Sequence, residues 1–163
     1  MSVSTRNLLE EYLRKRSARY QLIEHRVCRS AEQSTAARSE AGYPDSEGAK
    51  ALLVKSKSGF STLVLHADVK FDRGRVKKRL GGDFRFASAD ELMELTKLEY
   101  GMMPPFGPSL FPQIESLFVD TAVLEYPLIG FNACCLDHSI VISIEEYLKC
   151  AKPTEIISLA NSD

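Results

Sequence analysis

The sequence predicts an α+β fold in which helices cover a mixed, largely antiparallel sheet. Three observations support this prediction: helical and extended segments alternate irregularly over 163 residues, two extended segments are separated by a tight turn, and 44% of the residues are hydrophobic. Regular alternation would favour a doubly wound parallel sheet, and helical periodicity alone would favour a bundle. The length corresponds to one domain, which we place over residues 1–163, with residues 1–19 as an N-terminal helical extension.

The first quarter of the chain is predicted to contain two helices and a strand. Leucine and tyrosine residues at helical spacing predict an amphipathic helix over residues 5–18, and a short apolar run predicts a strand over 20–24. Ser30 and Gln33 have the spacing of a capping box. They predict a second helix over 30–41, which ends before a glycine.

The middle of the chain contains the clearest strand signal. Two apolar, β-branched runs at 50–55 and 60–66 are separated by a Lys-Ser-Gly turn and predict a hairpin. A basic helix is predicted over 73–80, because two glycines follow it at 81–82. The alternating residues 84–86 then predict one more short strand.

The last part of the chain is predicted to mix helices, strands and one irregular loop. Ser88 and Glu91 form a capping box that opens a helix to about residue 98. Residues 101–112 contain too much glycine and proline for regular structure and predict a shaped loop. The remaining predicted elements are strands at 116–120, 122–126 and 139–143 and a final helix that begins at Ser143 and ends near residue 152.

The charge is nearly balanced overall but is locally uneven. The net charge of −1 gives the whole protein no strong attraction for nucleic acid. Residues 70–85, however, carry seven basic and two acidic side chains. Helical spacing turns Arg73, Lys77 and Lys78 toward solvent. These three side chains either contact phosphate groups or form an ordinary solvated helix face.

Common catalytic and cofactor motifs are absent from the sequence. It contains no G-x-S-x-G elbow, no P-loop, no G-x-G-x-x-G and no H-x-x-x-H pair, and its three histidines are scattered. Its four cysteines lack C-x-x-C spacing and are interpreted as reduced thiols. We therefore expect no metal and no cofactor. Because neither a signal peptide nor an uninterrupted apolar span is visible, we expect a cytoplasmic protein without membrane contact.

Two features leave both a structural and a functional interpretation open. Lys50 begins an otherwise apolar strand, so its ammonium group either reaches the sheet edge or is held over a pocket. The loop 101–112 is either a rigid crossover or a wall that presents backbone N–H groups to a ligand.

Several segments, taken in order over about residues 20–150, resemble the YbaK family. This family comprises aminoacyl-tRNA deacylases that also occur as the editing insertion of bacterial prolyl-tRNA synthetases. No single motif is highly specific, and the ordered set carries the resemblance. The segments are Ile23-Glu24-His25, Gly48-Ala49-Lys50-Ala51-Leu52-Leu53-Val54, Leu80-Gly81-Gly82, Ala87-Ser88-Ala89-Asp90-Glu91-Leu92, Gly101-Met102-Met103-Pro104-Pro105-Phe106-Gly107, Phe118-Val119-Asp120 and Gly130-Phe131-Asn132-Ala133.

The resemblance implies a partly barrel-like sheet and a catalytic role for Lys50, Gly101 and Pro105. Lys50 matches the family lysine in the pocket that receives the 3′ end of a mischarged tRNA. Residues 101–105 match the family's G-x-x-x-P loop, which holds the terminal adenosine and the ester. Water, assisted by the 2′-hydroxyl of the tRNA, then attacks the aminoacyl carbonyl. This mechanism needs no protein nucleophile, in agreement with the missing motifs.

The resemblance also implies a set of substrate-binding residues. His25 matches a position that lines the pocket, although a structural histidine is an equal alternative. Asn132 resembles a pocket asparagine, and a turn asparagine is its alternative. Ser139 falls near a polar family position. The set is completed by the loop residues Met102, Met103 and Pro104, of which the two methionines replace small or polar residues of many relatives.

The resulting functional hypothesis is a free-standing trans-editing hydrolase. It removes a small amino acid, such as alanine, serine or threonine, from the acceptor end of a mischarged tRNA, and Arg73, Lys77 and Lys78 contact the tRNA backbone. An aminoacyl-tRNA synthetase is a possible partner, DNA is not, and we expect a monomer or weak dimer. Two alternatives remain: a silent tRNA-end or nucleotide-binding module that associates with a synthetase, and thiol chemistry at Cys134-Cys135.

Overall fold

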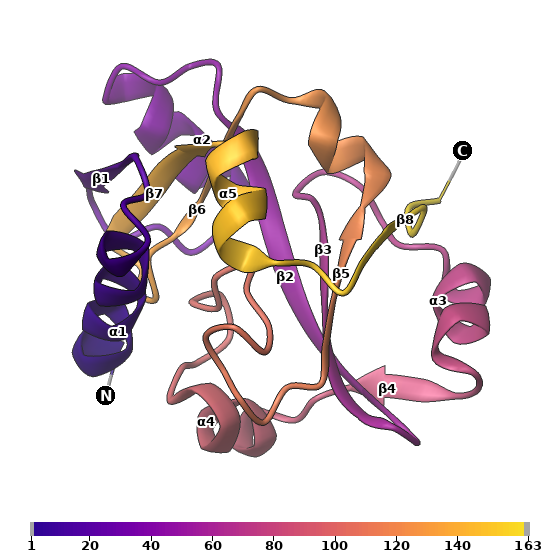
Figure 1. Ribbon diagram of the computed structural model, residues 1–163. Helices are drawn as coiled ribbons and strands as arrows, with labels where there is room; N and C mark the ends of the chain where they lie inside the picture. The colour runs from indigo at the N-terminus through magenta and orange to yellow at the C-terminus, as the bar shows by residue number, and fades with distance from the viewer. Residues whose placement is uncertain (1, 162–163) are drawn as a thin grey trace.

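The structure, a computed structural model, describes residues 2–161 and contains helices on both sides of one mixed sheet (Figure 1). The helices are α1 Ser2–Lys15, α2 Ala31–Glu40, α3 Arg73–Leu80, α4 Ala89–Thr96, α5 Ile144–Ala151 and the 3₁₀ helix η1 Thr121–Glu125. The strands are β1 Tyr20–Glu24, β2 Glu47–Ser56, β3 Gly59–His66, β4 Phe84–Phe86, β5 Ser116–Asp120, β6 Leu128–Asn132, β7 His138–Ser143 and β8 Glu155–Ile157.

The sheet has the strand order β1-β7-β6-β2-β3-β5-β8, with β4 paired to β2 off this path. The pairs β1–β7, β6–β7, β2–β3 and β2–β4 are antiparallel, and the pairs β2–β6, β3–β5 and β5–β8 are parallel. Over the described residues the path ends at β1 and β8, so the sheet does not close into a barrel. The predicted α+β class with a mixed sheet is confirmed.

The central hairpin β2–β3 is covered on both faces, which explains its nearly continuous apolar sequence. Neighbouring residues of a strand point to opposite faces. Accordingly, Leu53 and Val64 belong to the larger core cluster, whereas Val54, Leu63 and Leu65 belong to a second cluster that includes Val76 of α3. A strand buried on both faces does not show the alternating pattern of a half-exposed strand.

The N-terminal helix is integrated into the larger core. Leu9 and Leu13 of α1 are completely buried. The hydroxyl of Thr5 donates to the backbone oxygen of Thr96 at the end of α4 (3.1 Å). None of the helices within residues 2–161 is both long enough and apolar enough to cross a membrane.

The predicted strand at 122–126 is wrong, because this segment forms the 3₁₀ helix η1. The strands β6 and β8 were not predicted from the sequence. Asp120 accepts a hydrogen bond from the N–H of Ala122 (3.2 Å) and thereby caps the 3₁₀ helix η1 at this position. The strand that follows is β6, which starts only after Pro127. β8 has three residues and exists through its parallel pairing with β5, a long-range contact that local periodicity does not report.

We expect Asp120→Ala to lower the free energy of unfolding by about 3 kcal/mol, since hydrogen bonds to a buried charged group are the strong ones. The buried Asp120 carboxylate accepts from the N–H groups of Leu159 (2.6 Å) and Ala160 (3.0 Å) as well as from Ala122. Urea denaturation measures the change. Asp83→Ala is the control, because the exposed Asp83 carboxylate only pairs with Lys77 and should change stability by less than about 1 kcal/mol. Equal stability of the two variants would contradict this role of Asp120.

Candidate active site

A cavity of about 360 Å³ lies where β2 and β6 separate. These two strands pair only at Glu47–Ile129 and Gly48–Gly130. Beyond this point residues 48–53 of β2 and 130–132 of β6 form two walls of the cavity, and α2 and the segment 100–103 form others. The short parallel pairing therefore produces the opening within the sheet.

Four of the residues predicted from the sequence line this cavity: Lys50, Gly101, Met103 and Asn132. They come from β2, the Gly/Pro-rich loop and β6, so tertiary structure brings together three segments that are far apart in the chain. The Nζ atom of Lys50 donates to the backbone oxygen of Val69 (2.5 Å). Burial lowers the pKa of Lys50, the nearby Lys70 charge lowers it further, and Asp68 opposes both effects.

Asn132 ties the Gly/Pro-rich loop to the sheet. Its Nδ2 atom donates to the backbone oxygen of Gly101 (2.5 Å), and its Oδ1 atom accepts from the Ser34 hydroxyl of α2 (3.5 Å). Gly101 has a φ of +88°, a left-handed conformation that a residue with a side chain rarely adopts. Asn132 and Gly101 together fix the start of the loop at the edge of the cavity.

The rest of the loop is anchored in the core behind the cavity wall. The Pro105 carbonyl accepts from the buried Tyr147 hydroxyl (2.6 Å), and the Phe106 ring packs edge-on against Tyr147 (centroids 5.8 Å apart). Pro104 and Pro105 are buried, and Met102 packs against the larger core cluster. These three side chains support the loop from behind, whereas Gly101 and Met103 face the cavity.

His25 and Ser139 contact each other and do not line the cavity. The His25 Nε2 atom is 2.8 Å from the Ser139 hydroxyl, which is completely buried. The Nδ1 atom is 2.7 Å from the Arg26 carbonyl oxygen, which can only accept, so Nδ1 is the donor in this hydrogen bond. Cys28 does line the cavity, 3.6 Å from Nδ1. Because Nδ1 is already a donor, His25 cannot accept the thiol proton of Cys28 there.

The three predicted tRNA-backbone residues lie on α3, away from the cavity and at the opposite end of the molecule from α1 (Figure 1). Arg73 donates to the Phe84 carbonyl oxygen (3.0 Å), and Lys77 pairs with Asp83 (2.9 Å). Lys78 is exposed and forms no ion pair with a described residue.

Arg38 of α2 is a cavity residue that sequence reasoning missed. Its side chain is 2% exposed and lies across Gly48 and Gly130, the paired glycines of β2 and β6. A Cβ atom on Gly130 would lie 2.3 Å from the Arg38 Nε atom, and one on Gly48 would lie 3.4 Å from Nη2. The only signal in the sequence was that each of these glycines begins one of the segments that carry the family resemblance.

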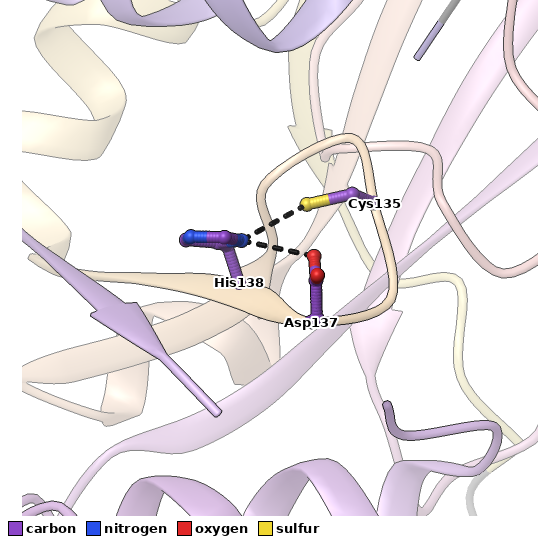
Figure 2. A group of neighbouring side chains, drawn as sticks. All are labelled: Cys135, Asp137 and His138. Atoms are coloured by element: carbon purple, nitrogen blue, oxygen red, sulfur yellow. Dashed lines mark hydrogen bonds and ion pairs between the residues drawn. The ribbon is translucent and has the colours of Figure 1, made fainter. Parts of the chain in front are cut away.

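A separate group consists of Cys135 and Asp137 of the turn between β6 and β7 and His138, the first residue of β7 (Figure 2). Their ligand atoms are within 4.8 Å of one another. The Cys135 sulfur (3.7 Å) and the Asp137 carboxylate (2.9 Å) both approach Nδ1 of His138, whereas a nucleophilic triad needs them at different ring nitrogens. The Arg6 guanidinium is 3.3 Å from the same ring and disfavours a cation.

Neither cysteine of the adjacent pair is an activated thiol. Burial raises the pKa of the Cys134 thiol well above its usual range. Burial and the Asp137 carboxylate also raise the pKa of Cys135. Since the thiolate is the nucleophile, this environment argues against thiol chemistry at Cys134-Cys135.

Comparison with known proteins agrees with this geometry. The model of the aminoacyl-tRNA editing domain matches residues 28–150. The chain belongs to this family. The sequence resemblance to YbaK-type proteins is therefore confirmed, and the matched range includes the cavity-lining Arg38, Lys50, Gly101 and Asn132.

Individual relatives support the family assignment and the fold. The chain is 34% identical over 113 residues to the multifunctional Ser/Thr-tRNA deacylase ProXp-y of Escherichia coli K12, a match that spans 66% of the length of each protein. A crystal structure of a candidate trans-editing enzyme for prolyl-tRNA synthetase superposes with a TM-score of 0.82 at 19% identity, covering 97% of this chain and 98% of the other. The hypothetical protein APE2540 superposes with a TM-score of 0.79 at 22% identity, covering 94% and 99%.

We expect Tyr147→Phe to lower the free energy of unfolding by about 1–2 kcal/mol, because it leaves the buried Pro105 carbonyl without its donor. Hydrogen exchange in the loop 101–112 should become faster as well. Thermal denaturation and hydrogen-exchange mass spectrometry measure these effects. The control is Tyr126→Phe, since the Tyr126 hydroxyl makes no hydrogen bond to a described residue. Unchanged exchange in the loop of Tyr147→Phe would contradict the anchoring role.

Proposed function

We propose that the protein is a cytoplasmic trans-editing hydrolase that deacylates tRNA mischarged with a small amino acid. The observation that carries this proposal is the composition of the cavity: Lys50, Gly101 and Asn132 meet there, and no aspartate, glutamate or histidine is among the described residues that line it. Membership in the aminoacyl-tRNA editing domain family indicates the substrate class. Serine and threonine are the first amino acids to test, given the activity named for the E. coli relative.

The cavity suits stabilisation of an oxyanion. Attack on the aminoacyl ester places negative charge on the carbonyl oxygen, and preorganised donors stabilise that charge without reorganisation. Gly101 and Met103 line this cavity and their N–H groups donate to no described residue, whereas the N–H of Met102 donates to the Glu99 carbonyl (3.1 Å). Together with the Lys50 ammonium group, these two N–H groups are the donors that we propose stabilise the negative charge on the carbonyl oxygen.

The general base is supplied by the substrate in this mechanism. Of the hydroxyl and thiol groups in the cavity, Ser30 caps α2, Ser34 donates to Asn132, Tyr100 donates to the Ala87 carbonyl and the Cys28 thiol donates to the Arg26 carbonyl (3.3 Å). None has a carboxylate or an accepting imidazole beside it in the described residues. The 2′-hydroxyl of the terminal ribose lies next to the ester and is the group that orients or deprotonates the attacking water.

The basic helix α3, which lies away from the cavity, is the second region that we propose contacts tRNA. We place the acceptor-stem backbone near the basic helix α3, where Lys78 is the exposed side chain without an ion pair. We also propose that the protein is a monomer or a weak dimer and that it associates with an aminoacyl-tRNA synthetase. Light scattering after size-exclusion chromatography, with and without the synthetase, measures both properties.

We expect Lys50→Ala to lower the deacylation rate by about 100-fold or more, as loss of one preorganised charge typically does. The fold should be retained, because Lys50 is only partly buried and contributes little to the core. The assay uses tRNAs charged with alanine, serine, threonine, cysteine and proline. Lys55→Ala is the control, since Lys55 lies on the same strand but does not line the cavity.

Full activity of Lys50→Ala would overturn the mechanism. Release of no amino acid by the wild-type protein would overturn the hydrolase itself and favour a silent tRNA-end binding module. Release of one or two small amino acids would identify the substrate.

The ammonium group of Lys50 should lose its proton below the ordinary lysine pKa of 10.5, because burial disfavours the charged form. As pH rises, the positive charge of Lys50 is therefore lost before the pH reaches this ordinary lysine value. NMR titration of ¹³C-methylated protein measures this, with the Lys50 resonance assigned by its absence from Lys50→Ala. A Lys50 resonance that titrates at or above 10.5 would contradict the expectation.

A further inference from the structure

Arg38 is a buried cation without an acidic partner. Its Nε atom donates to the Ser46 hydroxyl (3.0 Å) and its Nη2 atom to the Thr35 hydroxyl (3.2 Å), and both acceptors are uncharged. No carboxylate of the described residues lies within 4.0 Å of the guanidinium. The Glu47 carboxylate interacts electrostatically with Arg38 only at longer range, and Glu47 is itself paired with His66 (2.9 Å). A buried charge normally has a partner of opposite charge, and Arg38 has none within 4.0 Å among the described residues.

Part of the guanidinium remains free to bind a ligand. Arginine has five N–H donors, and only two of those of Arg38 have acceptors among the described residues. Nη1 has none. No fully buried side-chain nitrogen or oxygen among the described residues lacks a hydrogen-bond partner, so Nη1 is not fully buried, and Arg38 is one of the residues that line the cavity. Nη1 and the second N–H of Nη2 form a fork of the kind that binds two oxygens of one anion.

The direction of this fork is fixed by the backbone beneath it. The side chain lies against Gly48 and Gly130, and a Cβ atom at Gly130 would clash with Nε at 2.3 Å. Arg38 is thus held between α2 and the β2–β6 junction, and little conformational freedom is left to lose on binding.

The charge of the whole cavity points to an anion. Arg29, Arg38 and Lys50 line it, and no acidic side chain among the described residues does. An aminoacyl ester brings its own ammonium group, which finds no counter-charge in this cavity. The anion carried by the end of a nucleic acid chain is phosphate. The planar guanidinium of arginine can bind two phosphate oxygens in a bidentate contact, whereas the ammonium group of lysine cannot.

We propose that Arg38 binds a phosphate group of the nucleotide chain that enters the cavity and so positions the ester against Lys50. The identification of this group as the phosphate next to the terminal nucleoside rests on the proposed deacylase function. Arg38 is a positioning residue, whereas Lys50 and the loop N–H groups contact the reacting ester.

The test compares adenosine 5′-monophosphate with adenosine as ligands of the full chain. The 5′-phosphate takes the place of the phosphate that precedes the terminal nucleoside. We expect the wild-type protein to bind the monophosphate about tenfold or more tightly, the range of one charge-assisted contact, and Arg38→Gln to bind both within about twofold. Arg38→Lys keeps the charge but not the fork and should show an intermediate preference. Lys149→Gln removes an exposed charge of α5 outside the cavity and should keep the full preference.

A folded Arg38→Gln protein that keeps the full preference would overturn the inference, as would a wild-type protein that binds both ligands equally. If Arg38→Gln does not fold, the Nε–Hε NMR resonance of Arg38 in the wild-type protein decides. It should move on addition of the monophosphate and stay in place with adenosine, and the absence of a selective shift would overturn the inference.

The same variants separate this inference from the proposed function. In the deacylation assay Arg38→Gln should raise KM about tenfold and change kcat much less, because the phosphate contact is made in both the ground state and the transition state. A wild-type protein that binds the monophosphate through Arg38 but releases no amino acid would overturn the deacylase and leave the anion site intact. If the wild-type protein is an active deacylase but Arg38→Gln keeps the full preference for the monophosphate, the anion site at Arg38 is overturned and the deacylase function stands.

Discussion

The two-residue parallel pairing between β2 and β6 is the constraint on which the rest of the structure depends. It joins the β1-β7-β6 part of the sheet to the β2-β3-β5-β8 part. Longer pairing would place a continuous sheet where the cavity now lies. Because the pairing stops after Gly48–Gly130, the strands part, and residues of both strands face an opening that α2 and the Gly/Pro-rich loop close from the sides. The active-site cavity is thus a consequence of sheet topology.

The same junction explains the electrostatics of the site. Paired glycines leave room for one large side chain, and Arg38 fills it. A guanidinium and an ammonium group then line one cavity without a carboxylate among its described residues, an arrangement that costs free energy in the unliganded protein. An anionic ligand recovers that cost. In the proposed function, the site selects by charge before it selects by the size of the amino acid, and the loop residues Gly101 and Met103 add neutral donors for the ester.

The support for the loop shows how a site without a protein nucleophile is kept rigid. Asn132 holds the first residue of the loop, Tyr147 holds Pro105, and aromatic packing holds Phe106. Prolines restrict the backbone between these anchors. Rigid N–H groups are worth more than mobile ones to a developing oxyanion, since they need no reorganisation during the reaction. The core behind the loop, which includes α1 and α5, is in this sense part of the site.

The sequence by itself determined most helices, the central hairpin and the family, because these depend on local signals: helical periodicity, capping residues such as Ser88, turn glycines and short ordered motifs. It also indicated Lys50, Gly101, Met103 and Asn132, which line one cavity. Only the tertiary structure decided that Asp120 starts a 3₁₀ helix, that β8 joins the sheet, that His25 faces Ser139, and that Arg38 lies over two glycines. The physical reason is the range of the interactions. Caps and periodicity act within a few residues, whereas Arg38 meets Gly130 through a pairing of strands about eighty residues apart, which no local pattern encodes.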